Sequence, residues 1–203
     1  MALIDHPVVF LDKDGTLLKD VPYNVDPRQM VFEGGAVSGL RRLYAAGFRF
    51  VLVTNQSGVA RGLFPERALL KVEAHLRHMM RYEAGVELDG FYYCPHHPEG
   101  SVPAYAVECA CRKPQPGMLL TAARDLGINL STAWMIGDIL NDVEAGKRAN
   151  CRTVLIDNGN ETEWKPGANR SPDFVVTDMN AAADLILTSL RLAALDQPSS
   201  SRP

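Results

Sequence analysis

Short apolar runs alternate along this chain with longer segments of helical periodicity, and this alternation limits the folds that the chain can adopt. The runs predicted to be strands lie at 8–11, 48–54, 90–93, 133–136, 153–156 and 174–176. The segments predicted to be helices lie at 36–46, 65–82, 117–126, 141–149 and 180–195. Strands separated by helices are typical of βαβ units, which build a parallel sheet covered by helices. We therefore predict an α/β fold with a mainly parallel sheet.

The composition indicates one globular domain. The 203 residues are 46% hydrophobic and 22% charged, with a formal net charge of -3. They can bury one core, and they carry no positive field for nucleic acid or an anionic membrane. The first residues lack a leader pattern, and no apolar run is long enough for a bilayer, so we expect a cytoplasmic location. We also expect a single domain over 1–195, a disordered Ser/Pro-rich tail over 196–203, and a monomer.

Two carboxylates follow the first predicted strand. The apolar run at 8–11 leads directly into the sequence DKDGT at 12–16. A carboxylate at the end of a buried strand needs a cation or solvent, because an isolated buried charge is strongly unfavourable. The spacing is typical of an aspartate nucleophile, Asp12, with an acid/base partner, Asp14. The alternative is a simple corner that uses Asp and Gly for turn geometry.

Polar residues also follow two later strands. Thr54 and Asn55 end the second predicted strand, Asp138 follows the fourth, and Lys113 lies in the long loop between them. Taken singly, these could be a strand-end residue, a helix N-cap and a surface charge. The carboxyl ends of parallel strands meet at one edge of a sheet, where ligands bind. One site that also includes Asp12 explains them all together.

The residues of this expected site suit phosphoryl transfer. The reaction needs a nucleophile, a divalent cation and groups that neutralise the equatorial oxygens. Asp12 would attack phosphorus, and Asp14 would protonate the leaving oxygen and then activate water. Asp12, Asp138 and the main-chain carbonyl of Asp14 would bind a hard cation, which indicates Mg²⁺. Thr54 and Lys113 would stabilise the phosphoryl group.

Four motifs, in order along the chain, resemble those of the haloacid dehalogenase (HAD) superfamily of phosphohydrolases. They are DKDGT at 12–16, TNQ at 54–56, RKP at 112–114 and GDILND at 137–142. The resemblance implies a Rossmann-like core, an aspartyl-phosphate mechanism and Mg²⁺. It also implies that Asp142 supports the metal site without being a ligand. The sequence between Ser57 and Asp138 contains no large cap domain.

Three of the four cysteines lie in one irregular, proline-rich segment. Cys94 and His96 stand at its start, and Cys109 and Cys111 stand at its end. Three thiolates and one imidazole form a closed tetrahedral set for structural Zn²⁺. A disulfide is the alternative, but clustered cysteines in an intracellular chain favour a metal. His97 is an alternative ligand to His96.

Two longer segments resemble one particular group within this superfamily. TNQSGVARG at 54–62 and YYCPHHP at 92–98 are similar to the D-glycero-D-manno-heptose 1,7-bisphosphate 7-phosphatases, which act in activated-heptose biosynthesis. They are less similar to the related histidinol-phosphate phosphatases. The zinc loop, residues 94–111, ends directly before Arg112 and Lys113, so the zinc would position these two cations over the phosphate.

The same resemblance assigns the residues that bind substrate. They are Asp20, Val21, Pro22, Tyr23, Asn55, Gln56, Ser57 and Arg112. Arg112 would bind the far end of the substrate, and a guanidinium suits a second phosphate because it binds phosphate through two hydrogen bonds. The expected function is hydrolysis of the 7-phosphate, with histidinol phosphate as the alternative substrate. The alternative of another class, a zinc-stabilised module that binds phosphate or nucleic-acid ends without catalysis, is opposed by the carboxylate pair and the acidic net charge.

Overall fold

The computed structural model describes residues 6–195, which contain one six-stranded sheet whose neighbouring strands are all parallel. Its order is β3-β2-β1-β4-β5-β6. The strands are β1 (Val8–Leu11), β2 (Arg49–Asn55), β3 (Gly90–Cys94), β4 (Trp134–Gly137), β5 (Arg152–Ile156) and β6 (Phe174–Val176). The predicted α/β fold with a parallel sheet is confirmed. The tail predicted at 196–203 lies outside the described residues.

Strand β1 lies in the middle of the sheet, where the order of the strands reverses. Leu11 pairs in register with Leu52 of β2 on one side and with Ile136 of β4 on the other. Every residue of β1 is buried, as expected for a strand covered on both faces. Ligands bind outside the carboxyl ends of the strands at such a reversal. The loops that follow β1, β2 and β4 therefore surround one crevice.

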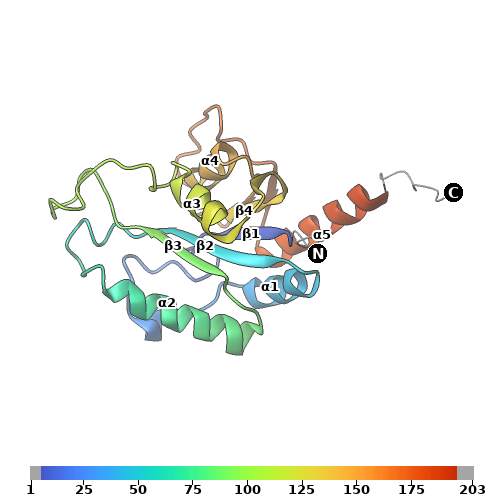
Figure 1. Cartoon of the computed structure of the whole chain (residues 1–203), viewed down its shortest axis with the longest axis horizontal. Helices are drawn as coiled ribbons and strands as arrows, with labels where there is room; N and C mark the ends of the chain where they lie inside the picture. Colours follow the sequence, from blue (N-terminus) through green and yellow to red (C-terminus); the bar gives the residue numbers. More distant parts are fainter. Residues whose placement is uncertain (1–5, 196–203) are drawn as a thin grey trace.

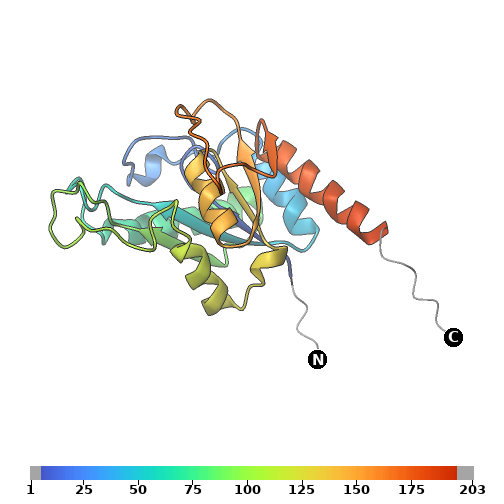
Figure 2. The same ribbon diagram turned by 90° about the horizontal axis from the view of Figure 1, so that it is seen from above.

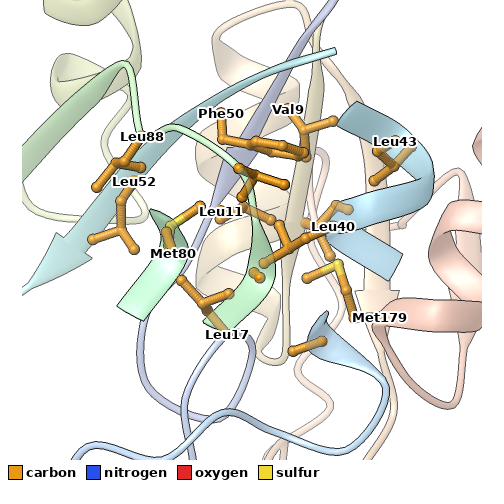
Figure 3. Close-up of a cluster of buried hydrophobic side chains, with 14 of the residues drawn as sticks. Val9, Leu11, Leu17, Leu40, Leu43, Phe50, Leu52, Met80, Leu88 and Met179 are labelled. Carbon is orange, nitrogen blue, oxygen red and sulfur yellow. The ribbon is translucent and has the colours of Figure 1, made fainter. Parts of the chain in front are cut away.

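Within the described residues, five α-helices cover the two faces of the sheet (Figures 1 and 2). They are α1 (Ala36–Ala45), α2 (Ala68–Met79), α3 (Gly117–Leu126), α4 (Leu140–Arg148) and α5 (Met179–Leu195). Helices α1, α2 and α5 pack on one face, and α3 and α4 pack on the other. Alternate residues of β1 enter the two cores: Val9 and Leu11 lie in the first (Figure 3), and Val8 and Phe10 lie in the second. None of the helices in this part of the chain has the length and apolar character needed to cross a membrane.

The predicted elements lie within a few residues of the observed ones, and the largest difference is at α2. A helix was predicted over 65–82, but the regular helix is shorter and continues as a π-helical turn, Met80–Ala84. Gly85 ends this turn at φ +69°, a left-handed conformation that suits glycine. Two short 3₁₀ turns, Pro27–Gln29 and Leu130–Thr132, were not predicted.

Candidate active site

Three aspartates meet at the carboxyl ends of β1 and β4. Asp12 follows β1, Asp138 follows β4, and Asp142 lies in the first turn of α4. One carboxylate oxygen of each lies within 4.8 Å of the others, and the three residues are 8%, 4% and 0% exposed. Buried carboxylates this close together disfavour one another's charge. Nearby positive charge is therefore needed to keep the three carboxylates ionised.

Lys113 supplies one positive charge to this cluster. Its ammonium pairs with Asp12 and, at 2.6 Å, with Asp142, and it donates to the carbonyl of Val53 at 2.9 Å. Burial disfavours the ammonium, but the two carboxylates outweigh burial and raise the pKa of Lys113. Burial, with repulsion from Asp12, raises the pKa of Asp138. Burial also raises the pKa of Asp142 despite the neighbouring ammonium. One lysine does not neutralise three carboxylates, so the cluster suits a further cation.

Asp14 lies beside the cluster and is more open to solvent, with 30% of its side chain exposed. The buried ammonium of Lys13 pairs with its Oδ1, and Gln56 Nε2 lies 3.4 Å from its Oδ2 as a donor. Partial burial raises the pKa of Asp14 and outweighs the opposing effect of Lys13. A raised pKa favours the protonated form that a general acid requires. The contact with Lys13 was not predicted from the sequence.

Gly15 allows the loop after β1 to pass directly over Asp138. Its φ is +79°, in the left-handed region that suits glycine. A Cβ atom at this position would lie 2.1 Å from Asp138 Oδ2 and 2.4 Å from Asn160 Nδ2. The glycine of the DKDGT sequence is therefore required by the neighbouring carboxylate as well as by the backbone conformation.

The residues at the end of β2 hold other parts of the site. Asn55 Nδ2 donates to the carbonyl of Lys113 at 3.0 Å, and Asn55 Oδ1 accepts from the amide of Lys113 at 3.0 Å. Gln56 Nε2 donates to Thr54 Oγ1 at 3.0 Å. Thr54 is 1% exposed. The side chain of Asn55 thus fixes the main chain of Lys113, a contact that the sequence did not suggest.

A pocket of about 280 Å³ opens next to Asp14. It is lined by Asp14, Asp20, Pro22, Tyr23, Asn24, Asn55, Gln56, Ser57 and Gly58. Most of the predicted substrate-binding residues line it, but Val21 and Arg112 do not. Asn24 and Gly58 line it and were not predicted. A larger hollow on the outer surface of α1 contains none of the predicted residues.

Arg112 lines a different pocket, of about 270 Å³, on the side of the zinc loop. Its Nη1 donates to the carbonyl of His96 at 3.4 Å. Burial lowers the pKa of Arg112, and the charge of Arg61 acts in the same direction. Within residues 6–195, neither guanidinium forms an ion pair with a carboxylate. The two arginines therefore leave positive charge beside the loop at 94–111.

Cys94, His96, Cys109 and Cys111 come together at the end of β3. The Sγ–Sγ distances are 3.5 Å from Cys94 to Cys109, 3.0 Å from Cys94 to Cys111, and 3.2 Å from Cys109 to Cys111. His96 Nδ1 lies 3.6 Å from Cys94 Sγ and 3.4 Å from Cys111 Sγ. The cysteines are free, because a disulfide has S–S of about 2.05 Å. Zn–S bonds of about 2.3 Å give a tetrahedron with edges of about 3.7 Å, so the set approaches the size that zinc requires. His97 does not belong to this group.

The loop after β5 also reaches the site, although none of its residues was predicted there. Asn160 Nδ2 donates to Asp138 Oδ2 at 2.7 Å, and Asn158 Nδ2 donates to the carbonyl of Gly15 at 2.7 Å. Asn and Gly after an apolar run are also common in ordinary turns. The one sequence signal was their position directly after the predicted strand at 153–156.

Comparisons with known proteins agree with this architecture. A family model described as HAD-hydrolase-like matches residues 110–182. D-glycero-beta-D-manno-heptose-1,7-bisphosphate 7-phosphatase of Yersinia pestis is 42% identical over 185 residues, which are 91% of this chain and 91% of that protein. The enzyme of the same name from Escherichia coli K12 is 42% identical over 180 residues, which are 88% of this chain and 91% of that protein.

Solved structures give the same result. The D,D-heptose 1,7-bisphosphate phosphatase from B. bronchiseptica, complexed with magnesium and phosphate, is 32% identical with a TM-score of 0.76 and covers 90% of this chain and 99% of its own. A HAD-like phosphatase from Mesorhizobium loti is 34% identical with a TM-score of 0.77 and covers 92% of this chain and 87% of its own. By sequence and by structure, the chain belongs to the D-glycero-beta-D-manno-heptose-1,7-bisphosphate 7-phosphatase family of HAD-like hydrolases.

Proposed function

We propose that this protein hydrolyses the 7-phosphate of D-glycero-β-D-manno-heptose 1,7-bisphosphate in activated-heptose biosynthesis. The observation that carries the proposal is the carboxylate pair at the edge of the pocket, with Asp12 held by Lys113 and Asp14 open to the pocket. The substrate is the one named for relatives that match the chain over most of its length.

The reaction takes place in two steps at the pair of aspartates. Asp12 attacks phosphorus, the bond between phosphorus and the C7 oxygen breaks, and Asp14 gives its proton to that oxygen. Asp14 then takes a proton from water as the water oxygen attacks phosphorus of the aspartyl-phosphate. Inorganic phosphate leaves, Asp12 is again a carboxylate, and Asp14 is again protonated. Lys113 and Thr54 stabilise the equatorial oxygens during both steps.

Asp12, Asp138 and the main-chain carbonyl of Asp14 are the proposed ligands of Mg²⁺. The buried carboxylates offer oxygen ligands, and their negative charge exceeds the positive charge of Lys113. Such a site suits a hard divalent cation. Mg²⁺, when bound, polarises the phosphoryl oxygens and offsets their charge. Asp142 pairs with Lys113 at 2.6 Å, which favours a supporting role over direct ligation.

Cys94, His96, Cys109 and Cys111 are the proposed ligands of a structural Zn²⁺. Four protein ligands leave no open position for water, so this zinc would take no part in the chemistry. Its role would be to order the zinc loop, which ends next to Arg112 and Lys113. An irregular loop of this length needs such a fixed point.

The pocket beside Asp14 is the proposed site of the sugar. Its lining residues Asp20, Asn55, Gln56 and Ser57 offer hydrogen bonds to hydroxyl groups. Val21 belongs to the same loop without lining the pocket. Arg112 would bind the phosphate that is not cleaved, from the zinc-loop side. A heptose bisphosphate can use both parts of this site, whereas histidinol phosphate has no second phosphate for Arg112.

A direct comparison of substrates tests this proposal. We expect kcat/KM for the β-heptose 1,7-bisphosphate to exceed that for histidinol phosphate by about 100-fold or more, because a site built for a polar group rejects substrates that lack it. Phosphorus NMR should show heptose 1-phosphate as the product. The α anomer, measured in parallel, gives the anomeric preference. Equal values for the bisphosphate and histidinol phosphate would contradict the proposed substrate.

A further inference from the structure

The loop between β5 and β6 contacts both loops that carry the aspartates. Asn158 Nδ2 donates to the carbonyl of Gly15 at 2.7 Å, next to the DKDGT turn. Glu161 Oε2 accepts from the amide of Leu140 at 2.7 Å, at the start of α4. We call residues 158–161 the brace, because these contacts join the loop after β1 to the loop after β4.

The brace also contacts the side chain of Asp138 directly. Asn160 Nδ2 donates to Asp138 Oδ2 at 2.7 Å, and Thr16 Oγ1 donates to Asp138 Oδ1 at 3.1 Å. Two donors from two separate loops therefore fix the plane of this carboxylate. The absence of a side chain at Gly15 provides the necessary space, because a Cβ atom there would lie 2.4 Å from the Asn160 amide.

The side chain of Asn160 takes no part in the packing of the hydrophobic core. Asn160 itself is exposed, whereas Asp138 is only 4% exposed. An exposed asparagine adds little to the hydrophobic core, and substitutions at such positions usually have small effects on stability. The contact with Asp138 is therefore the main consequence of its side chain.

We propose that Asn160 is a positioning residue that orients the Asp138 carboxylate for divalent cation binding. The inference rests on the proposed function, which places Mg²⁺ at Asp12 and Asp138. Groups that hydrogen-bond to a ligand carboxylate fix its orientation, and their removal typically weakens metal binding by about 10–100-fold. Glu161 and Asn158 hold the brace in place, so that the Asn160 amide meets Asp138 in a defined direction.

Titration with Mn²⁺ alone, followed by electron paramagnetic resonance of the free ion, tests this inference without substrate. Asn160→Ala and the similarly sized Asn160→Leu both remove the donor, and each should raise the Kd for Mn²⁺ by about 10–100-fold. The Tm of the metal-free protein should stay unchanged. With the bisphosphate as substrate, the Mg²⁺ concentration for half-maximal rate should rise in the same proportion, while kcat at saturating Mg²⁺ changes little. Asn169→Ala, at an exposed asparagine in the same loop, is the matched control and should bind Mn²⁺ like the wild type.

An unchanged Kd for Mn²⁺ in both Asn160 variants would overturn the inference. A lower Tm of the metal-free protein together with an unchanged Kd would show a structural role instead. A wild-type protein that binds Mn²⁺ but does not hydrolyse the heptose bisphosphate would refute the proposed substrate and leave the role of Asn160 intact. A wild type that binds no divalent cation would refute both.

Discussion

The side chain of Asn55 holds the main chain of Lys113 with a pair of hydrogen bonds, each 3.0 Å long. This contact joins the end of β2 to the second residue after the zinc loop. It determines where the Lys113 ammonium can reach, and that ammonium pairs with the proposed nucleophile Asp12. The position of the Lys113 ammonium therefore depends on the side-chain amide of Asn55, which contacts only the main chain of Lys113.

Replacing Asn55 should reduce turnover more than it reduces stability. In Asn55→Ala the main chain of Lys113 loses both hydrogen bonds, and we expect kcat to fall by about 10–100-fold, which corresponds to about 1.4–2.7 kcal/mol in the barrier. Asn55→Asp keeps the acceptor for the Lys113 amide and should retain part of the rate. Steady-state kinetics with Asn169→Ala as the control measures the effect. Wild-type kcat in Asn55→Ala would show that the pair of bonds is dispensable.

Replacing the nucleophile should abolish turnover and leave the fold intact. An amide at position 12 cannot form the aspartyl-phosphate, so Asp12→Asn should lose at least about a thousandfold in kcat. Circular dichroism should remain that of the wild type. Appreciable phosphatase activity in this variant would contradict the assignment of Asp12. Asp14→Asn, which retains the nucleophile but not the acid, should be slow in both steps.

Loss of one cysteine of the cluster should lower zinc content and melting temperature together. Cys109→Ser replaces a thiolate by a hydroxyl that binds zinc poorly, and the free energy of zinc binding is part of the folding free energy. Elemental analysis and thermal melts should show both losses. Cys151 is a buried thiol outside the cluster, so Cys151→Ala should keep its zinc. A wild-type protein that contains no zinc would refute the proposed site.

The metal-free protein should become less stable as pH rises. Burial, with the neighbouring carboxylates, raises the pKa of Asp138 from 3.8 to about 8. The native state then binds this proton more tightly than the unfolded state, so the stabilisation is present below about pH 4 and is lost as pH rises through about 8.

Thermal melts across this range check the sign of the effect. Tm of the metal-free protein should fall between about pH 5 and about pH 8, and Mg²⁺ should raise Tm more at the higher pH, because the cation competes with the proton. Asp138→Asn should flatten both trends. A metal-free Tm that rises over this range would show that other groups dominate.

Much of the fold could be predicted from the sequence, because buried parallel strands leave a strong local pattern. The strand at 8–11 and the helix at 117–126 have the observed bounds, since turns and helix ends flank them closely. The convergence of Asp12 and Asp138 followed from the rule that parallel strands end at one edge. Helix α2 was harder to predict, because its end changes to a π-helical turn without a break in the apolar pattern.

The contacts that organise the site could not be predicted in the same way. Asn160 reaches Asp138 from a loop whose residues are ordinary turn formers, and only the tertiary structure brings the two together. Asn55 was assigned to substrate binding because it belongs to a motif, and it lines the pocket, but the hydrogen bonds of its amide to the main chain of Lys113 could not be foreseen. Hydrogen bonds between distant segments have no periodicity in the sequence, whereas apolar faces do.

The three oxygens that surround the Lys113 ammonium have a consequence for the order of events. The ammonium donates hydrogen bonds to Asp12 and to the Val53 carbonyl, and it forms an ion pair with Asp142 at 2.6 Å. An incoming phosphate must therefore displace one of these acceptors before Lys113 can serve it. The Val53 carbonyl is fixed within β2, so the exchange falls on a carboxylate. In the proposed reaction, Asp12 loses its negative charge as it forms the bond to phosphorus, so the Lys113 ammonium can shift from the Asp12 carboxylate to the equatorial oxygens during the first step.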